Sequence, residues 1–126
     1  MLKLRKEQIA IFEALFNKKF RADILKHARE DLAEETEEMS DEDIDFLIDE
    51  AITRGYSNGI AFERNIMLFF DLLIFKGRHF EKDRKNRWIN KVLTDEDLDE
   101  NAKMETIYLR LAAIENRETQ ELEEMG

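Results

Sequence analysis

Cysteine and proline are absent from the chain, and its 126 residues include only four glycines and two histidines. The absence of cysteine excludes a disulfide framework and thiolate chemistry, and it is typical of proteins from a reducing compartment. The lack of proline and the scarcity of glycine remove the residues that punctuate strands and turns. Because good helix formers such as Glu, Lys and Leu are abundant instead, we expect an all-α fold.

Catalytic and metal-binding signatures are missing as well. The sequence has no Gly-rich phosphate loop and no G-x-S-x-G motif. Asp23 and His27 have the helical spacing of two metal ligands, but no further ligand pattern accompanies them. The D-x-D-x-D runs at 41–45 and 95–99 lack the later glycine and glutamate of a calcium loop, and we interpret them as acid-rich helix starts. We therefore expect a non-enzymatic protein without a cofactor or a metal site.

Long apolar runs and targeting segments are not found either. A membrane-spanning helix needs about 20 apolar residues, and no segment approaches that length. The first residues, MLKLRKEQ, lack the apolar stretch of a signal peptide. We expect a cytoplasmic protein without a membrane partner. The net charge of −10 also argues against nucleic acid as the main partner, because binding to phosphates relies on a net basic face.

Apolar residues are nevertheless plentiful enough for a core, since they make up 43% of the chain and include nine phenylalanines. The length fits a single helical domain over 1–126, built from about five helices. In the segment 66–75 every residue except Asp71 is apolar, which predicts a helix that is buried on all sides. We expect this central helix to span 60–76 and the others to pack around it.

Periodic apolar residues and capping signals predict the other helices. Ser40 begins a capping box, and Gly55 is placed to end the same helix in a left-handed C-cap. Thr94 with Asp97 repeats the capping signal. The acidic residues from about 117 onward predict a frayed tail. The remaining predicted helices span about 6–27, 40–55, a short segment around Trp88, and 98–116.

Asp71 needs a partner, because an ionised carboxylate among apolar side chains costs several kcal/mol unless it is paired or hydrogen-bonded. Arg64 lies two helical turns earlier on nearly the same face and is one candidate. The Trp88 indole, a backbone amide and a helix N-terminus are the others. We interpret Asp71 and Arg64 as buried structural polar residues. The functional alternative is an acid with a raised pKa that serves catalysis.

Charge is strongly segregated along the sequence. Twelve acids and no Lys or Arg fall in 30–50, whereas seven Lys or Arg and two acids fall in 76–91. Phe80 and Trp88 are interleaved with these bases, which could describe a patch for stacking RNA. We favour protein binding, with both aromatics in the core, because the surrounding acidic field would repel a polyanion. The predicted contacts to an acidic partner are Arg78, Lys82, Arg84, Lys85 and Arg87.

The sequence contains a series of short motifs at Gly59-Ile60, Glu63-Arg64, Phe70-Asp71-Leu72, Gly77, Phe80 and Trp88. With these motifs, the stretch from the Gln8 helix to Val92-Leu93 resembles a group of small all-helical bacterial proteins, which are encoded beside type VI secretion spike components and their toxic effectors. The pattern of the group is roughly G-I-x-x-E-R-D, F-L-D-L, G-x-x-F and P-W. Here Asn65 replaces the last Asp of the first motif, and Arg87 stands where a Pro would precede the Trp.

The resemblance implies an accessory role without catalytic residues: an adaptor or co-chaperone of an effector, or an immunity protein that neutralises a cognate toxin. The expected partner is then an effector, a toxin or a spike component. A small nucleic-acid regulator that uses 76–91 is the alternative from a different class. A homodimer is also compatible with the polarised charge.

Overall fold

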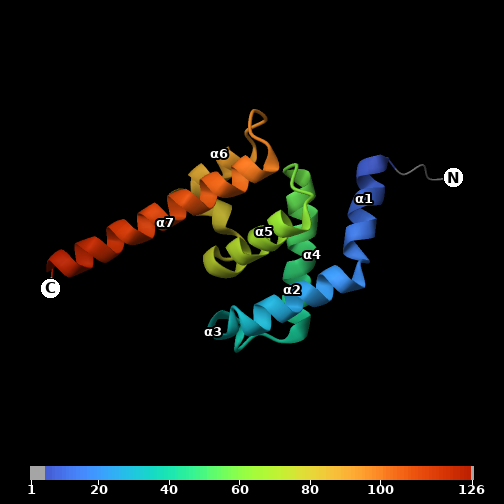
Figure 1. Ribbon diagram of the computed structural model, residues 1–126, viewed down its shortest axis with the longest axis horizontal. Coiled ribbons are helices and arrows are strands. Elements are labelled where there is room, and N and C mark those ends of the chain that lie inside the picture. Colours follow the sequence, from blue (N-terminus) through green and yellow to red (C-terminus); the bar gives the residue numbers. More distant parts are fainter. Residues whose placement is uncertain (1–4, 126) are drawn as a thin grey trace.

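The computed structural model describes residues 5–125, and every regular element in that range is helical (Figure 1). The described residues contain no strand, and the predicted all-α fold is confirmed. Two short 3₁₀ turns connect the fifth and sixth α-helices. In chain order the elements are α1 (Lys6–Leu15), α2 (Lys18–Glu30), α3 (Ala33–Thr36), α4 (Asp41–Ser57), α5 (Glu63–Lys76), η1 (Phe80–Lys82), η2 (Arg84–Asn86), α6 (Arg87–Leu93) and α7 (Glu100–Met125).

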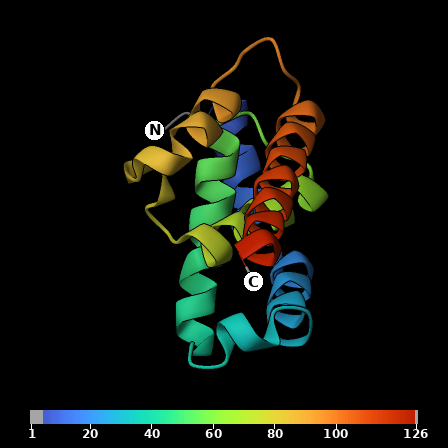
Figure 2. The same ribbon diagram turned by 90° about the vertical axis from the view of Figure 1, so that its left-hand side faces the viewer.

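Helix α5 lies at the centre of the core, as its composition predicts. Phe69, Phe70 and Leu72 are fully buried on it, and α4 and α7 pack against it (Figures 1 and 2). The helix begins at Glu63 instead of residue 60, and Ile60 is buried in the turn that precedes it. Among the described helices, none combines the length and the hydrophobicity that a membrane span requires.

The predicted first helix is two helices. Asn17 separates α1 from α2, and its side chain accepts a hydrogen bond from the backbone N–H of Phe20 at 3.0 Å. This N-cap starts a new helix because it satisfies an amide that has no intrahelical partner. Phe20 faces the core, whereas Phe12 and Phe16 on the other side of the break are exposed. The prediction of one helix over 6–27 was therefore wrong.

Helix α4 begins as predicted and ends later than predicted. Ser40 and Asp43 form the reciprocal hydrogen bonds of a capping box. Gly55 does not end the helix but is buried within it, where an added Cβ would meet the carbonyl oxygen of Ile60 at 3.4 Å. The left-handed backbone occurs at Gly59, with φ of 76°. Gly55 thus permits close approach of the next turn, and Gly59 makes the turn.

Helix α7 starts later and extends further than predicted. Asp99 caps it by accepting a hydrogen bond from the Ala102 amide at 2.8 Å, whereas the Thr94 hydroxyl donates back to Asn90 at the end of α6. The acidic tail beyond 117 was predicted to fray, but α7 continues to Met125 and projects from the body (Figure 1). Residues 118–125 contain neither Gly nor Pro and are rich in Glu, so their helix propensity is high.

Candidate protein-binding surface

Asp71 pairs with His27, not with Arg64. The Nε2 atom of His27 on α2 lies 2.7 Å from Oδ1 of Asp71 on α5, and its Nδ1 lies 2.8 Å from Oδ2 of Asp31. The side chain of Asp71 is 14% exposed. Arg64 is exposed and forms no ion pair with any described residue, so its assignment as a buried structural residue was wrong. It lines a cleft between α5 and α7 from the first turn of α5, where the buried polar residue is Asn65.

The surroundings of this pair shift both pKa values upward. Desolvation opposes protonation of His27, but the hydrogen bonds and charges of Asp31 and Asp71 together outweigh it and raise the His27 pKa. Burial raises the pKa of Asp71, although the hydrogen bond from His27 opposes that rise. A protonated imidazole can donate to both carboxylates at once. The three side chains therefore form a charged link between α2 and the central helix.

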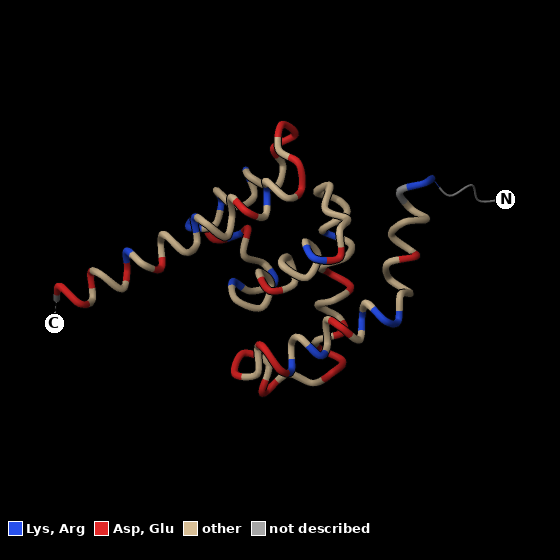
Figure 3. Tube along the Cα trace, in the orientation of Figure 1, with Lys and Arg blue, Asp and Glu red and all other residues tan. Residues whose placement is uncertain are grey.

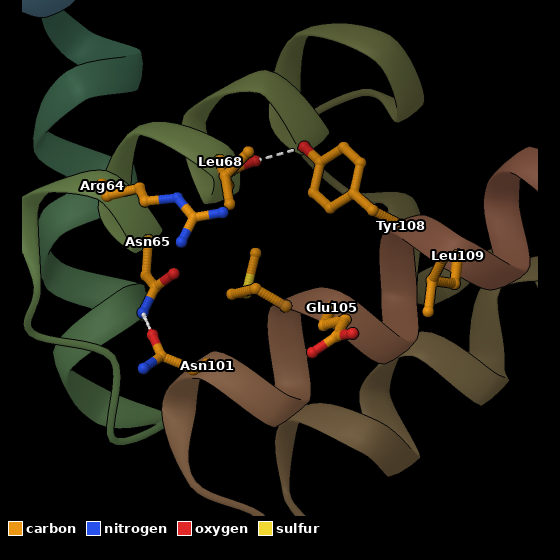
Figure 4. A pocket seen from close by; sticks show the side chains of 8 residues that line it. Arg64, Asn65, Leu68, Asn101, Glu105, Tyr108 and Leu109 are labelled. Atoms are coloured by element: carbon orange, nitrogen blue, oxygen red, sulfur yellow. Dashed lines mark hydrogen bonds between the residues drawn. The ribbon is translucent and has the colours of Figure 1, made fainter.

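A second polar link joins the start of α5 to α7. The Glu100 carboxylate accepts hydrogen bonds from the Phe62 amide at 2.8 Å and from the Asn65 side chain at 2.9 Å. Asn65 also donates to Asn101 at 2.8 Å (Figure 4). Lys103 is buried and donates to the Asn58 carbonyl oxygen at 2.8 Å. Sequence reasoning missed these residues because each partner lies more than thirty positions away along the chain.

All five residues predicted to contact a partner are exposed, but one of them is occupied within the chain. Arg78 forms an ion pair with Glu50 at 3.0 Å, and its guanidinium stacks 4.4 Å from the ring centroid of Phe46. The other four form no ion pair within residues 5–125. We define these four as the basic surface: Lys82, Arg84, Lys85 and Arg87.

The arginines of α2 and α4, unlike the residues of the basic surface, form ion pairs within the chain. Arg21 pairs with Asp49 at 2.7 Å, Arg29 pairs with Asp41 at 2.7 Å, and Arg54 on α4 pairs with Glu81 at 3.0 Å. The acidic segment 30–50 is thus partly neutralised by internal cations. Figure 3 shows how acidic and basic residues are distributed along the chain. The basic surface has no such internal neutralisation.

The two aromatic residues near the basic surface pack inward. Phe80 is buried, and its ring meets that of Phe69 edge to face with centroids 6.4 Å apart. The interpretation of Phe80 as a core residue is confirmed. Trp88 is partly buried against the core, and the Arg110 guanidinium stacks 4.4 Å from its ring. Neither ring is presented as an open platform for a nucleic-acid base.

Two neighbouring clefts follow the seam between α5 and α7 and meet at Tyr108. The first has a volume of about 580 Å³. Its lining includes the apolar residues Leu68 and Leu109 and the charged residues Arg64 and Glu105 (Figure 4). The Tyr108 hydroxyl donates to the Leu68 carbonyl oxygen, and burial with the charge of Asp71 raises its pKa, so the hydroxyl stays protonated. The apolar lining suits a side chain or a helix.

The chain matches no protein-family model, no curated protein and no solved structure. Its function is therefore inferred from the chemistry of its surfaces. Two of them stand out: the basic surface, where four exposed cations without internal partners fall within residues 82–87, and the apolar seam between α5 and α7.

Proposed function

We propose that this chain is a non-enzymatic protein-binding module whose basic surface binds an acidic surface of another protein. The observation that carries this proposal is a contrast between two sets of cations. Arg21, Arg29 and Arg54 are each occupied by an internal carboxylate, whereas the basic surface forms no ion pair in the part of the chain that the structure describes. A cluster of cations without internal partners is available to an external one.

The backbone that carries the basic surface is well anchored. Phe80 and Ile89 are buried at the two sides of this segment, and the Asp83 carboxylate accepts a hydrogen bond from the Lys85 amide at 3.0 Å. A segment that is ordered before binding loses less conformational entropy when the partner arrives. A single exposed ion pair is worth only about 0–1 kcal/mol, so four neighbouring charges would contribute mainly to encounter rate and specificity.

The resemblance of the sequence to proteins encoded beside type VI secretion effectors suggests which kind of protein the partner is and what the binding is for. We propose an adaptor or co-chaperone that binds an effector, with an immunity protein against a cognate toxin as the alternative. Co-production separates the two roles. An immunity protein restores growth to cells that produce the toxin, whereas an adaptor increases the recovery or export of the effector and leaves its toxicity unchanged.

The test of the basic surface is the double charge reversal Arg84→Glu/Lys85→Glu. Its matched control is Lys26→Glu/Arg117→Glu, which makes the same change in net charge at two exposed cations outside the basic surface. A pull-down at low salt supplies the partner, and calorimetry measures its affinity for each variant. We expect the dissociation constant to rise about tenfold or more for the double reversal and much less for the control. Equal affinities for the two variants would remove the basic surface from the proposal.

A small nucleic-acid regulator is a second candidate, because free cations in one segment could also contact phosphates. The buried ring of Phe80 and the Arg110 side chain over Trp88 count against base stacking. A gel shift at low salt tests it, since phosphate contacts give nonspecific binding that weakens steeply as salt rises. A shift that the Arg84→Glu/Lys85→Glu variant abolishes would favour this candidate over protein binding.

A further inference from the structure

Helix α1 has apolar residues on two faces. Ala14 and Leu15 pack against the core on the inner face. On the outer face Ile9 is 42% exposed, Phe12 is 47% exposed and Phe16, which directly follows the helix, is 77% exposed. These three positions recur at the spacing of a single helical stripe, the pattern by which an amphipathic helix binds in a groove. We define them as the head stripe.

The head stripe has basic surroundings. Residues 5–29 contain seven Lys or Arg against three acids. Lys6, Lys18 and Lys19 are exposed and form no ion pair with the residues that the structure describes. The N-terminal end of the molecule therefore combines uncovered aromatic side chains with free positive charge.

The opposite end of the molecule offers a complementary cleft. It lies between the last turn of α5 and α7, has a volume of about 590 Å³, and includes Leu111 and Ile114 in its lining. Phe75 at its edge is 53% exposed. Glu115 and Glu118 lie on its α7 side and Lys76 lies on its α5 side, while residues 111–125 contain five acids against one base. We define this second cleft of the α5–α7 seam as the tail cleft.

The two surfaces match in length and in charge. Ten residues of α1 extend about 15 Å, and the stretch of α7 from Tyr108 to Glu118 covers the same distance at a rise of about 1.5 Å per residue. The basic surroundings of the head stripe oppose the acidic wall of the tail cleft. Aromatic anchors in an apolar groove supply most of the energy of such an interface, and charge supplies steering.

A molecule cannot fill its own tail cleft, because α1 and the C-terminal half of α7 lie at opposite ends of the fold (Figures 1 and 3). We infer that the occupant is a second copy: the head stripe of one molecule docks into the tail cleft of the next. This contact is heterologous, so a row of molecules keeps one free head stripe at one end and one free tail cleft at the other. The inference goes beyond the proposed function, since it uses neither Arg84 nor Lys85.

The test compares the full-length chain with two variants. Phe12→Gln/Phe16→Gln removes the two aromatic residues of the head stripe, and Phe75→Gln/Glu118→Lys alters the tail cleft. All four positions are exposed, so folding is little affected. The matched control is Phe62→Gln/Leu122→Gln, which removes two exposed apolar side chains outside both surfaces. Sedimentation velocity over a range of concentrations measures association. Wild type and control should form oligomers that dissociate as salt rises. For each of the two variants, the dissociation constant of self-association should be at least about tenfold higher.

Mixing the two variants gives the decisive result. The head variant keeps an intact tail cleft, and the tail variant keeps an intact head stripe, so a mixture should form a dimer with one copy of each and nothing larger. Three results would overturn the inference: a wild-type chain that stays monomeric at every concentration, variants that associate as well as wild type, or a mixture that forms no dimer.

Discussion

At the scale of single residues, the link between His27 and Asp71 explains how a charged carboxylate persists on the central helix. The partner lies 44 positions away in the sequence and belongs to a different helix. Sequence reasoning identified Asp71 as a residue in need of a partner, because the energetic cost of burial is a local property. The candidate partners were Arg64, the Trp88 indole, a backbone amide and a helix N-terminus, and His27 was not among them because it reaches Asp71 only through tertiary packing.

The pH dependence of stability follows from the direction of the His27 shift. Its folded-state pKa lies above the ordinary value of 6.5, so the folded protein binds this proton more tightly than the unfolded chain. The stabilising contribution is fully present below that value and is lost as the pH rises through the folded pKa. We expect the free energy of unfolding, measured by urea titration, to fall across this window in wild type.

In the variant His27→Gln, the free energy of unfolding should decrease much less as the pH rises. The control is His79→Gln, because His79 is exposed and has no ion pair among the described residues; this variant should show the same decrease as wild type. His27→Gln should also be less stable at the acidic end of the window, because Asp71 loses its charged donor. A slope that survives in His27→Gln would show that another group controls the pH dependence.

Gly77 ends the central helix in a backbone conformation that favours glycine, with φ of 90° and ψ of 155°. An added Cβ at this position would meet no atom within 4 Å. The variant Gly77→Ala therefore isolates backbone strain from steric clash, and we expect a loss of about 1–3 kcal/mol in the free energy of unfolding. Chemical denaturation measures it, and an unchanged midpoint would contradict this explanation of the turn.

At the scale of elements, a helix could be predicted where its own residues leave few alternative structures, and could not be predicted where its bounds depend on other parts of the fold. α5 could be predicted because a segment that is apolar all round leaves few alternatives to burial. The break at Asn17 could not, since Phe12, Phe16 and Phe20 continue the spacing of one helix across it. Apolar periodicity shows which face of a helix is buried. It does not reveal a break between two helices when the apolar residues on both sides of the break keep the spacing of one helix.

The break itself can be tested through its cap. Asn17→Ala removes the side chain that accepts from the Phe20 amide, and we expect a loss of about 1 kcal/mol in the free energy of unfolding. Asn116→Ala is the control, because Asn116 is exposed in the interior of α7 and makes no side-chain hydrogen bond among the described residues. Thermal or urea denaturation measures both variants. Equal stability of the two would mean that the cap does not define the start of α2.

The surfaces were only partly predictable for a related reason. The sequence identified the basic stretch as a run of charges, and Arg78, Lys82, Arg84, Lys85 and Arg87 are all exposed. It could not show that Arg78 is occupied by Glu50 while the others are free, because that distinction depends on how α4 packs beside η1. The tail cleft likewise exists only where α5 ends beside α7.

At the scale of the whole molecule, charge and apolar surface are distributed unevenly. The chain carries a net charge of −10, yet residues 5–29 and 76–91 are each locally basic. Strong local fields of opposite sign increase association rates with complementary partners and depend on ionic strength. The molecule is thus suited to charge-guided binding at more than one surface.

The measurement that tests the central claim most directly is the salt dependence of partner affinity for wild type and for Arg84→Glu/Lys85→Glu. If the basic surface contacts an acidic partner, the affinity of wild type for that partner falls as the salt concentration rises. At low salt the dissociation constant of the variant is at least about tenfold higher, and it changes much less with salt concentration. Identical salt curves for the two proteins would contradict the account, because the charges of the basic surface would then contribute nothing to recognition.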